Sequence, residues 1–329
     1  MRHYLVRTIT SKPTSEKGEY KHRYTDKSGK KVSARVIKQY TENLYIPPAY
    51  DKVKINKNKK DKVLAIGYDT KGRAQYVYNE SFKTSQSEQK FKKMKQFGEA
   101  YPSIMRRVHK DMYTEGDSKE KQIALVLRLV TDCCFRIGNE KYEKDNNSHG
   151  ITTLHREHIK VKGTHVEIDF IGKKGVRNKC TIKNKKLNRV LKTKKRCAGK
   201  KDKLFMYRRG KRFHDLKSSD VNAYLKHFGD FSVKDFRTWI ANLELISQLT
   251  KQTIDVSLSQ AQKTKCVNSA LDKVAEKLHN TRSVCKNNYV DPYLVEIFTS
   301  ETERFKRAFS TCKTKEDIAK KYIALLKTR

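Results

Sequence analysis

The chain has 329 residues, and its 75 lysines and arginines against 36 aspartates and glutamates give a formal net charge of +39. Self-repulsion at this charge is relieved by a polyanion, which favours DNA or RNA as partner, with an anionic membrane surface as the other possibility. No apolar run is long enough to span a membrane, and the N-terminus lacks the apolar core of a signal peptide. We therefore expect a soluble, intracellular protein of one large or two smaller domains.

The seven cysteines form no CxxC pair; they are Cys133, Cys134, Cys180, Cys197, Cys266, Cys285 and Cys312. This spacing disfavours both a zinc knuckle and a disulfide framework. We therefore expect free thiols and a reducing compartment.

The first 80 residues are predicted to be rich in β-structure. "KVLAIGYDTKGRAQYVYNE" has an apolar strand at Val63–Ile66, a turn at Asp69–Gly72, and alternation through Gln75, Tyr76, Val77 and Tyr78. The following "SFKTSQSEQKFKKMKQF" is polar and helix-forming. We place the boundary there, which predicts a β-rich domain over residues 1–84 and a mainly helical one over 85–329.

The second domain begins with a strongly periodic helix. In "KEKQIALVLRLVTDCCFRIGNEKY" the helical spacing selects one buried face, formed by Ile123, Val126, Leu127, Val130, Cys134 and Ile137. A β-hairpin follows: "HVEIDF" points Val166, Ile168 and Phe170 inward, "IGKKG" turns, and "NKCTI" returns.

Three more helices are predicted further along the chain. "SSDVNAYLKHF" has a serine and aspartate N-cap, and "SVKDFRTWIANLELISQL" has Ser232 as its candidate cap. "CVNSALDKVAEKLHN" stops at His279–Asn280 and has one apolar face, formed by Val267, Leu271, Val274 and Leu278.

Side-chain cations are the chemical groups that the sequence offers for work on a phosphodiester. There is no GxxxxGK[ST] loop, and no group of acidic residues and histidines has metal-ligand spacing. Guanidinium suits the task because it is planar, always charged and able to grip two oxygens. Arg136 and Arg237 are each tethered to apolar helical sequence, although either alone fits an ordinary arginine whose stem lies along a helix.

Three other residues also have plain structural interpretations when taken singly. Lys173 is a turn lysine in "FIGKKG", and His279 suits a helix C-terminus, where the dipole favours it. Tyr289 follows ten residues later among polar neighbours in "LHNTRSVCKNNYVDP".

The order of these segments along the chain is more informative than any one of them alone. "FRIGNEKY", "FIGKKG", "KDFRTW" and "LHNTRSVCKNNYVDP" resemble, in this order, the type IB DNA topoisomerases in the compact form of poxviruses, other large DNA viruses and bacteria. "NLYIPPAYDKVKI" and "DTKGRAQYVY" resemble the N-terminal domain of that family; "DNNSHGITTLHREHIKV" and "SSDVNAYLKHF" resemble its catalytic domain. The resemblance implies an α+β fold, in which a β-rich clamp domain precedes a larger, mainly α catalytic domain with a β-hairpin.

The family resemblance also implies the activity and its residues. Such a protein relaxes supercoiled duplex DNA by nicking one strand through a 3′-phosphotyrosyl intermediate and religating it without ATP, metal or cofactor. Tyr289 would be the nucleophile, and Arg136 and Arg237 would hold the non-bridging oxygens of the scissile phosphate. His279 would hydrogen-bond one of these oxygens, and Lys173 would be the general acid for the leaving 5′ oxygen.

Candidate DNA contacts come from both predicted domains: Gln75, Tyr76, Tyr78, Tyr142 and Lys234. The tyrosines of the strand fit strand core equally well. Poxvirus relatives carry lysine where Asn139 stands and have a slightly shorter histidine–tyrosine spacing, so "RIGNE" and "NTRSVCKNNYVDP" look more like the bacterial branch. Arg282 departs from that branch, in which a proline is usual at this position. We expect sequence-tolerant binding of duplex DNA by a monomer, without nucleotide or membrane.

Two alternatives differ in class from a topoisomerase. Tyrosine recombinases share the catalytic fold, but their second arginine usually lies in an HxxR motif, whereas this chain has Lys234-Asp235-Phe236-Arg237. A non-enzymatic packaging protein would explain the charge but not the ordered motifs. The expected location is the bacterial cytoplasm or, for a viral protein, the virion and the site of viral replication.

Overall fold

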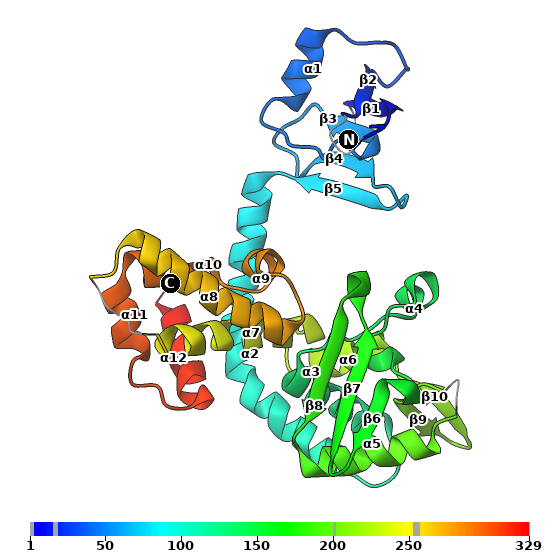
Figure 1. Ribbon diagram of the computed structural model, residues 1–329, viewed down its shortest axis with the longest axis vertical. Coiled ribbons are helices and arrows are strands. Elements are labelled where there is room, and N and C mark those ends of the chain that lie inside the picture. Colours follow the sequence, from blue (N-terminus) through cyan, green and yellow to red (C-terminus); the bar gives the residue numbers. More distant parts are fainter. Residues whose placement is uncertain (1–2, 16–18, 200–201, 253–256, 329) are drawn as a thin grey trace. The chain divides into compact units, whose positions relative to one another are not determined.

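The computed structural model describes residues 3–15, 19–199, 202–252 and 257–328, with the side chains of Lys83, Ser87 and Tyr142 outside this description. The chain divides into two compact units, residues 1–90 and 91–329. The first is built on a β-sheet and the second mainly on helices (Figure 1). This confirms the predicted α+β class. The division falls within helix α2 (Glu80–Met112), which also contains the boundary predicted near residue 84.

The N-terminal unit is an antiparallel sheet of strand order β2-β1-β3-β4-β5 with one short helix. Its elements are β1 (Tyr4–Ser11), β2 (Lys21–Thr25), α1 (Ala34–Thr41), β3 (Asp51–Asn56), β4 (Val63–Tyr68) and β5 (Ala74–Tyr78). Alternate residues face a small core, formed by Leu5, Ile46, Val53, Ile55 and Ala65. The predicted turn at Asp69–Gly72 is confirmed: Gly72 adopts φ 71°, and Asp69 Oδ1 accepts from the backbone N–H of Lys71 and Arg73.

The second unit, residues 91–329, packs its helices around a single core. Besides the rest of α2, its described helices are α3 (Lys119–Cys133), α4 (Glu140–Asn146), α5 (Lys185–Cys197), α6 (Ser218–Lys226), α7 (Val233–Thr250), α8 (Gln260–Leu278), α9 (Arg282–Asn288), α10 (Pro292–Ser300), α11 (Thr302–Phe309) and α12 (Lys315–Lys327). Helix α7 runs through the middle, where Trp239 stacks on Tyr322 of α12. Gly98 lets α2 pack closely against Trp239 of α7, since a Cβ at Gly98 would lie 2.5 Å from the Trp239 ring. None of the described helices is long and apolar enough to cross a membrane.

Short strands and 3₁₀ turns complete this unit. They are β6 (Ile159–Lys162), β7 (His165–Ile171), β8 (Arg177–Ile182), β9 (Met206–Arg209), β10 (Arg212–Asp215), η1 (Ile151–Thr153), η2 (Arg156–His158) and η3 (Lys173–Gly175). Strands β6, β7 and β8 form an antiparallel sheet in that order. Val166, Ile168 and Phe170 are buried, as the alternation predicts.

The helix predicted to continue through Ile137 instead ends at Cys133, so that part of the prediction is wrong. Cys134 caps α3 in the left-handed conformation, with φ 55°. The next residues leave the helix although the apolar spacing continues to Ile137. A left-handed cap at a cysteine has no clear sequence signal, because glycine or asparagine is usual there.

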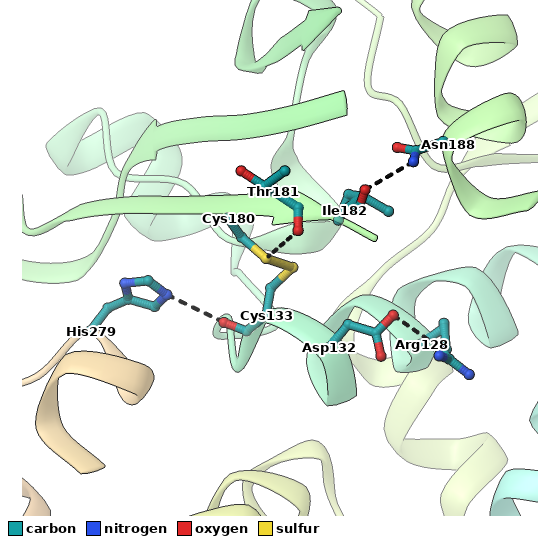
Figure 2. Close-up of a disulfide and its surroundings, with 8 residues drawn as sticks. All are labelled: Arg128, Asp132, Cys133, Cys180, Thr181, Ile182, Asn188 and His279. Atoms are coloured by element: carbon teal, nitrogen blue, oxygen red, sulfur yellow. Dashed lines mark hydrogen bonds and ion pairs between the residues drawn. A yellow bond between two sulfur atoms is a disulfide. The ribbon is translucent and has the colours of Figure 1, made fainter. Parts of the chain in front are cut away.

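The expectation that all cysteines are free thiols is also wrong. Cys133, at the end of α3, forms a disulfide with Cys180 of β8, and their Cα atoms are 5.7 Å apart (Figure 2). Packing of the helix against the strand brings together two residues that are 47 positions apart. The five free cysteines are Cys134, Cys197, Cys266, Cys285 and Cys312.

Candidate active site

Arg237 is the most deeply buried cation of the candidate site. Ser232 is the N-cap residue of α7, as predicted, and Asp235 Oδ2 accepts from its backbone N–H and its hydroxyl. Arg237 is only 2% exposed, and its Nη2 donates to the carbonyl of Leu278 at 3.0 Å. Its Nε and Nη1 have no hydrogen-bond partner among the described residues. A buried guanidinium with unused donors is costly until an anion supplies acceptors.

Arg136 lies in the non-helical segment that follows α3. Its carbonyl accepts from Ile151 N, which fixes the backbone, and its Nη2 donates to Asn280 Oδ1 at 2.5 Å. Gly138 and Gly150 let the segment after Arg136 pack directly against the segment before Ile151, since a Cβ on Gly150 would lie 2.4 Å from Gly138 Cα. Burial lowers the pKa of the Arg136 guanidinium, and the charge of Arg237 lowers it further. The two cations therefore lie close enough to influence each other electrostatically.

His279 caps α8 in a left-handed conformation with φ 51°, which confirms the predicted helix end. Its Nε2 lies 3.2 Å from the carbonyl of Cys133, so Nε2 carries the proton and donates it. Burial lowers the pKa of His279; the bond to Cys133 opposes this shift, and the charges of Arg237 and Arg136 add to it. The ring is therefore favoured in its neutral form, with one N–H donor.

Tyr289 follows α9 and is 8% exposed. Its ring lies beneath Arg237, whose Cζ is 5.1 Å from the ring centroid. Burial by itself would raise the pKa of Tyr289, but the neighbouring charges of Arg237, Arg136 and Lys234 outweigh burial, and the pKa is lowered. A phenol with a lowered pKa beside two guanidiniums is a candidate nucleophile.

Lys173 differs from the other four candidates in its surroundings. It begins η3 at the tip of the β7–β8 hairpin and is exposed. The tip turns through Lys174 and Gly175, which have φ values of 64° and 75°. The structure thus presents Lys173 on an exposed hairpin tip, whereas Arg237 and Tyr289 are buried and Arg136 and His279 are half-buried.

The candidate DNA contacts are distributed over both units. Tyr76 and Tyr78 are 51% and 39% exposed, and their rings stack with centroids 6.0 Å apart. They are therefore not strand core, which was the alternative left by the sequence. Gln75 is half-buried and donates to Asp69 Oδ2, while Lys234 is exposed near the start of α7. The predicted contact at Tyr142 lies outside the described residues.

Asn242 is a site residue that the sequence analysis missed. It is fully buried on α7, its Nδ2 donates to the carbonyl of Tyr289 at 3.0 Å, and its Oδ1 accepts from Asp291 N at 2.7 Å. It thereby fastens the backbone at the candidate nucleophile and just after it. The available signal was an asparagine within the apolar run "FRTWIANLELI".

Glu143, His149 and His155 bring potential metal-ligand atoms within 4.8 Å of one another, a proximity that the linear spacing did not reveal. His155 places Nε2 2.9 Å from Glu143 Oε1 and Nδ1 3.1 Å from the carbonyl of Asp202. Both ring nitrogens of His155 are thus already engaged within the protein. This arrangement instead fastens α4 to the loop before β6.

Comparison with known proteins identifies the family. Residues 79–316 match the model described as "Eukaryotic DNA topoisomerase I, catalytic core", and residues 21–69 match "Bacterial DNA topoisomerase IB, N-terminal domain". The chain belongs to the type IB DNA topoisomerases. It is 30% identical over 302 residues to "DNA topoisomerase 1B" of Acanthamoeba polyphaga mimivirus, which covers 86% of this chain and 89% of the relative. Poxvirus proteins are also similar: "DNA topoisomerase I" of Monkeypox virus is 26% identical and "DNA topoisomerase 1B" of Vaccinia virus (strain Copenhagen) 25%, each over 241 residues and 72% of both chains.

Membership in this family decides between the classes that the sequence left open. The protein is a type IB topoisomerase, rather than a site-specific recombinase or a packaging protein, and DNA is its substrate. The matched catalytic core of this topoisomerase includes Arg136, Lys173, Arg237, His279 and Tyr289.

Proposed function

We propose that Tyr289 is the nucleophile with which this topoisomerase nicks and rejoins one strand of supercoiled duplex DNA. The observation that carries the proposal is the pairing of a buried Arg237, with two unused donor atoms, and a buried tyrosine of lowered pKa beneath it. Attack on a phosphodiester requires hydrogen-bond donors that can bind the phosphate and a phenol that ionises readily.

The proposed reaction exchanges one phosphodiester for another. The Tyr289 oxygen attacks phosphorus, the bond to the 5′ oxygen breaks, and a 3′-phosphotyrosyl ester forms. Arg136 and Arg237 neutralise the charge of the non-bridging oxygens. His279 supplies one more hydrogen bond when its Nε2 proton turns from the Cys133 carbonyl to the phosphate. Religation reverses these steps, and because the ester conserves the bond energy, no ATP is consumed.

Lys173 is the proposed general acid. The leaving 5′ alkoxide needs a proton, and the ammonium group of a positioned lysine can give one. The narrow hairpin that carries Lys173 allows it to reach the DNA when duplex is bound.

Duplex DNA is the proposed form of the substrate, bound by a monomeric protein without nucleotide, cofactor, metal or membrane. We propose that the β-rich N-terminal domain, with its boundary near residue 84, closes over the duplex as a clamp. The stacked Tyr76 and Tyr78 and the neighbouring Gln75 are its proposed contacts, with Tyr142 and Lys234 on the catalytic domain. The proposed location is the bacterial cytoplasm or, for a viral protein, the virion and the replication site.

The decisive experiment compares Tyr289→Phe with Tyr293→Phe, a control four residues away on α10. Relaxation of a supercoiled plasmid is measured in EDTA without ATP, and the trapped covalent complex is mapped by mass spectrometry. Tyr289→Phe should bind duplex but neither nick nor relax it, since it lacks only the attacking oxygen. Tyr293→Phe should relax the plasmid and carry the adduct on Tyr289. An adduct on another residue, or an active Tyr289→Phe, would refute the proposal.

A further inference from the structure

We propose that the Cys133–Cys180 disulfide is a redox-controlled positioning crosslink of the active site. When closed, it holds the hairpin that carries Lys173 against the segment that carries Arg136, and its reduction slows cleavage. The inference rests on the function proposed above, in particular on the roles of Tyr289 and Lys173.

The crosslink joins the two segments at their bases. Cys133 is the last residue of α3, three positions before Arg136. Cys180 lies within β8, paired in register with Ile168 of β7. Lys173 is seven positions before Cys180, at the tip of the same hairpin. With the two Cα atoms held 5.7 Å apart, the stem of the hairpin cannot slide or tilt away from the end of α3.

The crosslinked end of α3 also holds His279. The carbonyl of Cys133 accepts the Nε2 proton of His279, as Figure 2 shows beside the disulfide. The ring of Phe135 packs between the hairpin and the histidine, with centroids 4.9 Å from Phe170 and 5.3 Å from His279. A shift of Cys133 is therefore transmitted to a proposed phosphate ligand as well as to the hairpin.

Small thiols can reach the disulfide from solvent. Both cysteines line a surface cavity of about 640 Å³, whose wall also includes His279. Cys180 is half-buried, whereas Cys133 is buried. The wall of the cavity carries four basic side chains, Arg177, Lys179, Lys273 and Lys277, and three acidic ones, Asp132, Glu244 and Glu276. The basic side chains nearest the sulfurs favour the thiolate form in which cysteine reacts.

Closure and opening follow thiol–disulfide exchange with a small-molecule disulfide. The thiolate of Cys180 attacks one sulfur of the oxidant, a mixed disulfide forms, and the first small thiol leaves. The thiolate of Cys133 then displaces the second small thiol. Two protein thiols are oxidised by two electrons, and one small disulfide is reduced to two thiols.

The closed crosslink should speed cleavage by limiting the conformations that Lys173 must search. A catalytic group misplaced by about 1 Å can cost about 10²-fold in rate. The contact of Phe135 with Phe170 persists after reduction and keeps part of the alignment. We therefore expect the reduced form to cleave roughly tenfold more slowly than the oxidised form.

The test uses the full chain equilibrated with reduced or oxidised glutathione. Alkylation and mass spectrometry identify the thiols that are blocked, and single-turnover cleavage is measured on duplexes with a 5′ oxygen or a 5′ sulfur leaving group. Cys180→Ser is compared with Cys197→Ser, which removes an exposed free thiol at the end of α5. Oxidised wild-type protein and oxidised Cys197→Ser should cleave the oxygen substrate roughly tenfold faster than their reduced forms. Cys180→Ser should match the reduced protein in both buffers.

The sulfur substrate separates positioning from a general effect on the fold. A sulfur leaving group needs no proton from Lys173, so the difference between oxidised and reduced protein should shrink on it. Equal rates on the oxygen substrate, an undiminished difference on the sulfur substrate, or a response abolished by Cys197→Ser would each overturn the inference. Absence of cleavage in every state would instead refute the catalytic roles on which it rests.

Discussion

Substituting Asn242 by alanine should disturb the position of Tyr289, the proposed nucleophile, while leaving its attacking oxygen in place. Asn242 is fully buried in α7 and bonds the carbonyl of Tyr289 and the N–H of Asp291. Asp291 in turn is buried and accepts from Tyr322 Oη at 3.3 Å. The side chain of Asn242 therefore fixes the backbone at the tyrosine and just after it through the Tyr289 carbonyl and the Asp291 N–H.

Alanine at this position would leave two buried backbone groups without their partners. An unsatisfied buried donor or acceptor costs about 1–3 kcal/mol, so Tyr289 O and Asp291 N together should lower the free energy of unfolding by about 2–6 kcal/mol. The bond from Asn242 to Thr238 O adds little, because that carbonyl lies within α7, whose own hydrogen bonds remain. Loosening the Tyr289 backbone by about 1 Å should slow cleavage by about 10²-fold.

Asn188→Ala is a matched control. Asn188 is also a buried asparagine that bonds two backbone groups, Val166 N and Ile182 O, each at 2.9 Å. Those groups lie at the end of the β7–β8 hairpin away from Lys173. Urea unfolding should show a similar loss of stability for both variants. Single-turnover cleavage, measured where both are folded, should drop strongly only for Asn242→Ala; equal cleavage rates at equal stability would refute the positioning role.

Four further outcomes are expected. Lys173→Ala should bind duplex normally but cleave about 10²–10⁴-fold more slowly, with rescue by a 5′ sulfur leaving group; without rescue, Lys173 would be only a phosphate contact. His279→Gln should stay within about tenfold of wild type in plasmid relaxation, because the amide still donates one hydrogen bond, whereas His279→Ala should lose about 10²-fold; equal losses would contradict the donor role. Reduction of the 47-residue Cys133–Cys180 link should lower the free energy of unfolding by about 4 kcal/mol in the chain-entropy model, which calorimetry would check against Cys180→Ser. The logarithm of the duplex association constant should fall with the logarithm of salt concentration by about 0.9 per neutralised phosphate, and a flat profile would remove the electrostatic account of binding.

Patterns within single segments located most of the candidate site. Helical periodicity correctly placed Arg237 on α7 and ended α8 at His279, and β-alternation gave the hairpin that carries Lys173. These features are local, because each depends on the chemistry of a few neighbouring residues. The order of the motifs added Arg136 and Tyr289, which no local pattern distinguishes from ordinary residues.

The features that sequence analysis missed depend on contacts between distant segments. Cys133 and Cys180 meet only because α3 packs on β8, and Asn242 reaches Tyr289 across 47 residues of chain. The end of α3 was missed for a different reason: Cys134 adopts a left-handed conformation while the apolar spacing continues past it. In each case tertiary packing decided the outcome over local preference.

In the proposed mechanism, binding of the phosphate changes the acidity of Tyr289. Burial by itself would raise the pKa of Tyr289, but the charges of Arg237 and Arg136 outweigh it and lower the pKa. A scissile phosphate between the same two guanidiniums adds a negative charge that offsets theirs, and this returns the pKa of the phenol toward its usual range. Phosphate binding and ionisation of the phenol therefore oppose each other. In this proposal the two arginines act on both groups: they favour the phenolate and they hold the phosphate that it attacks.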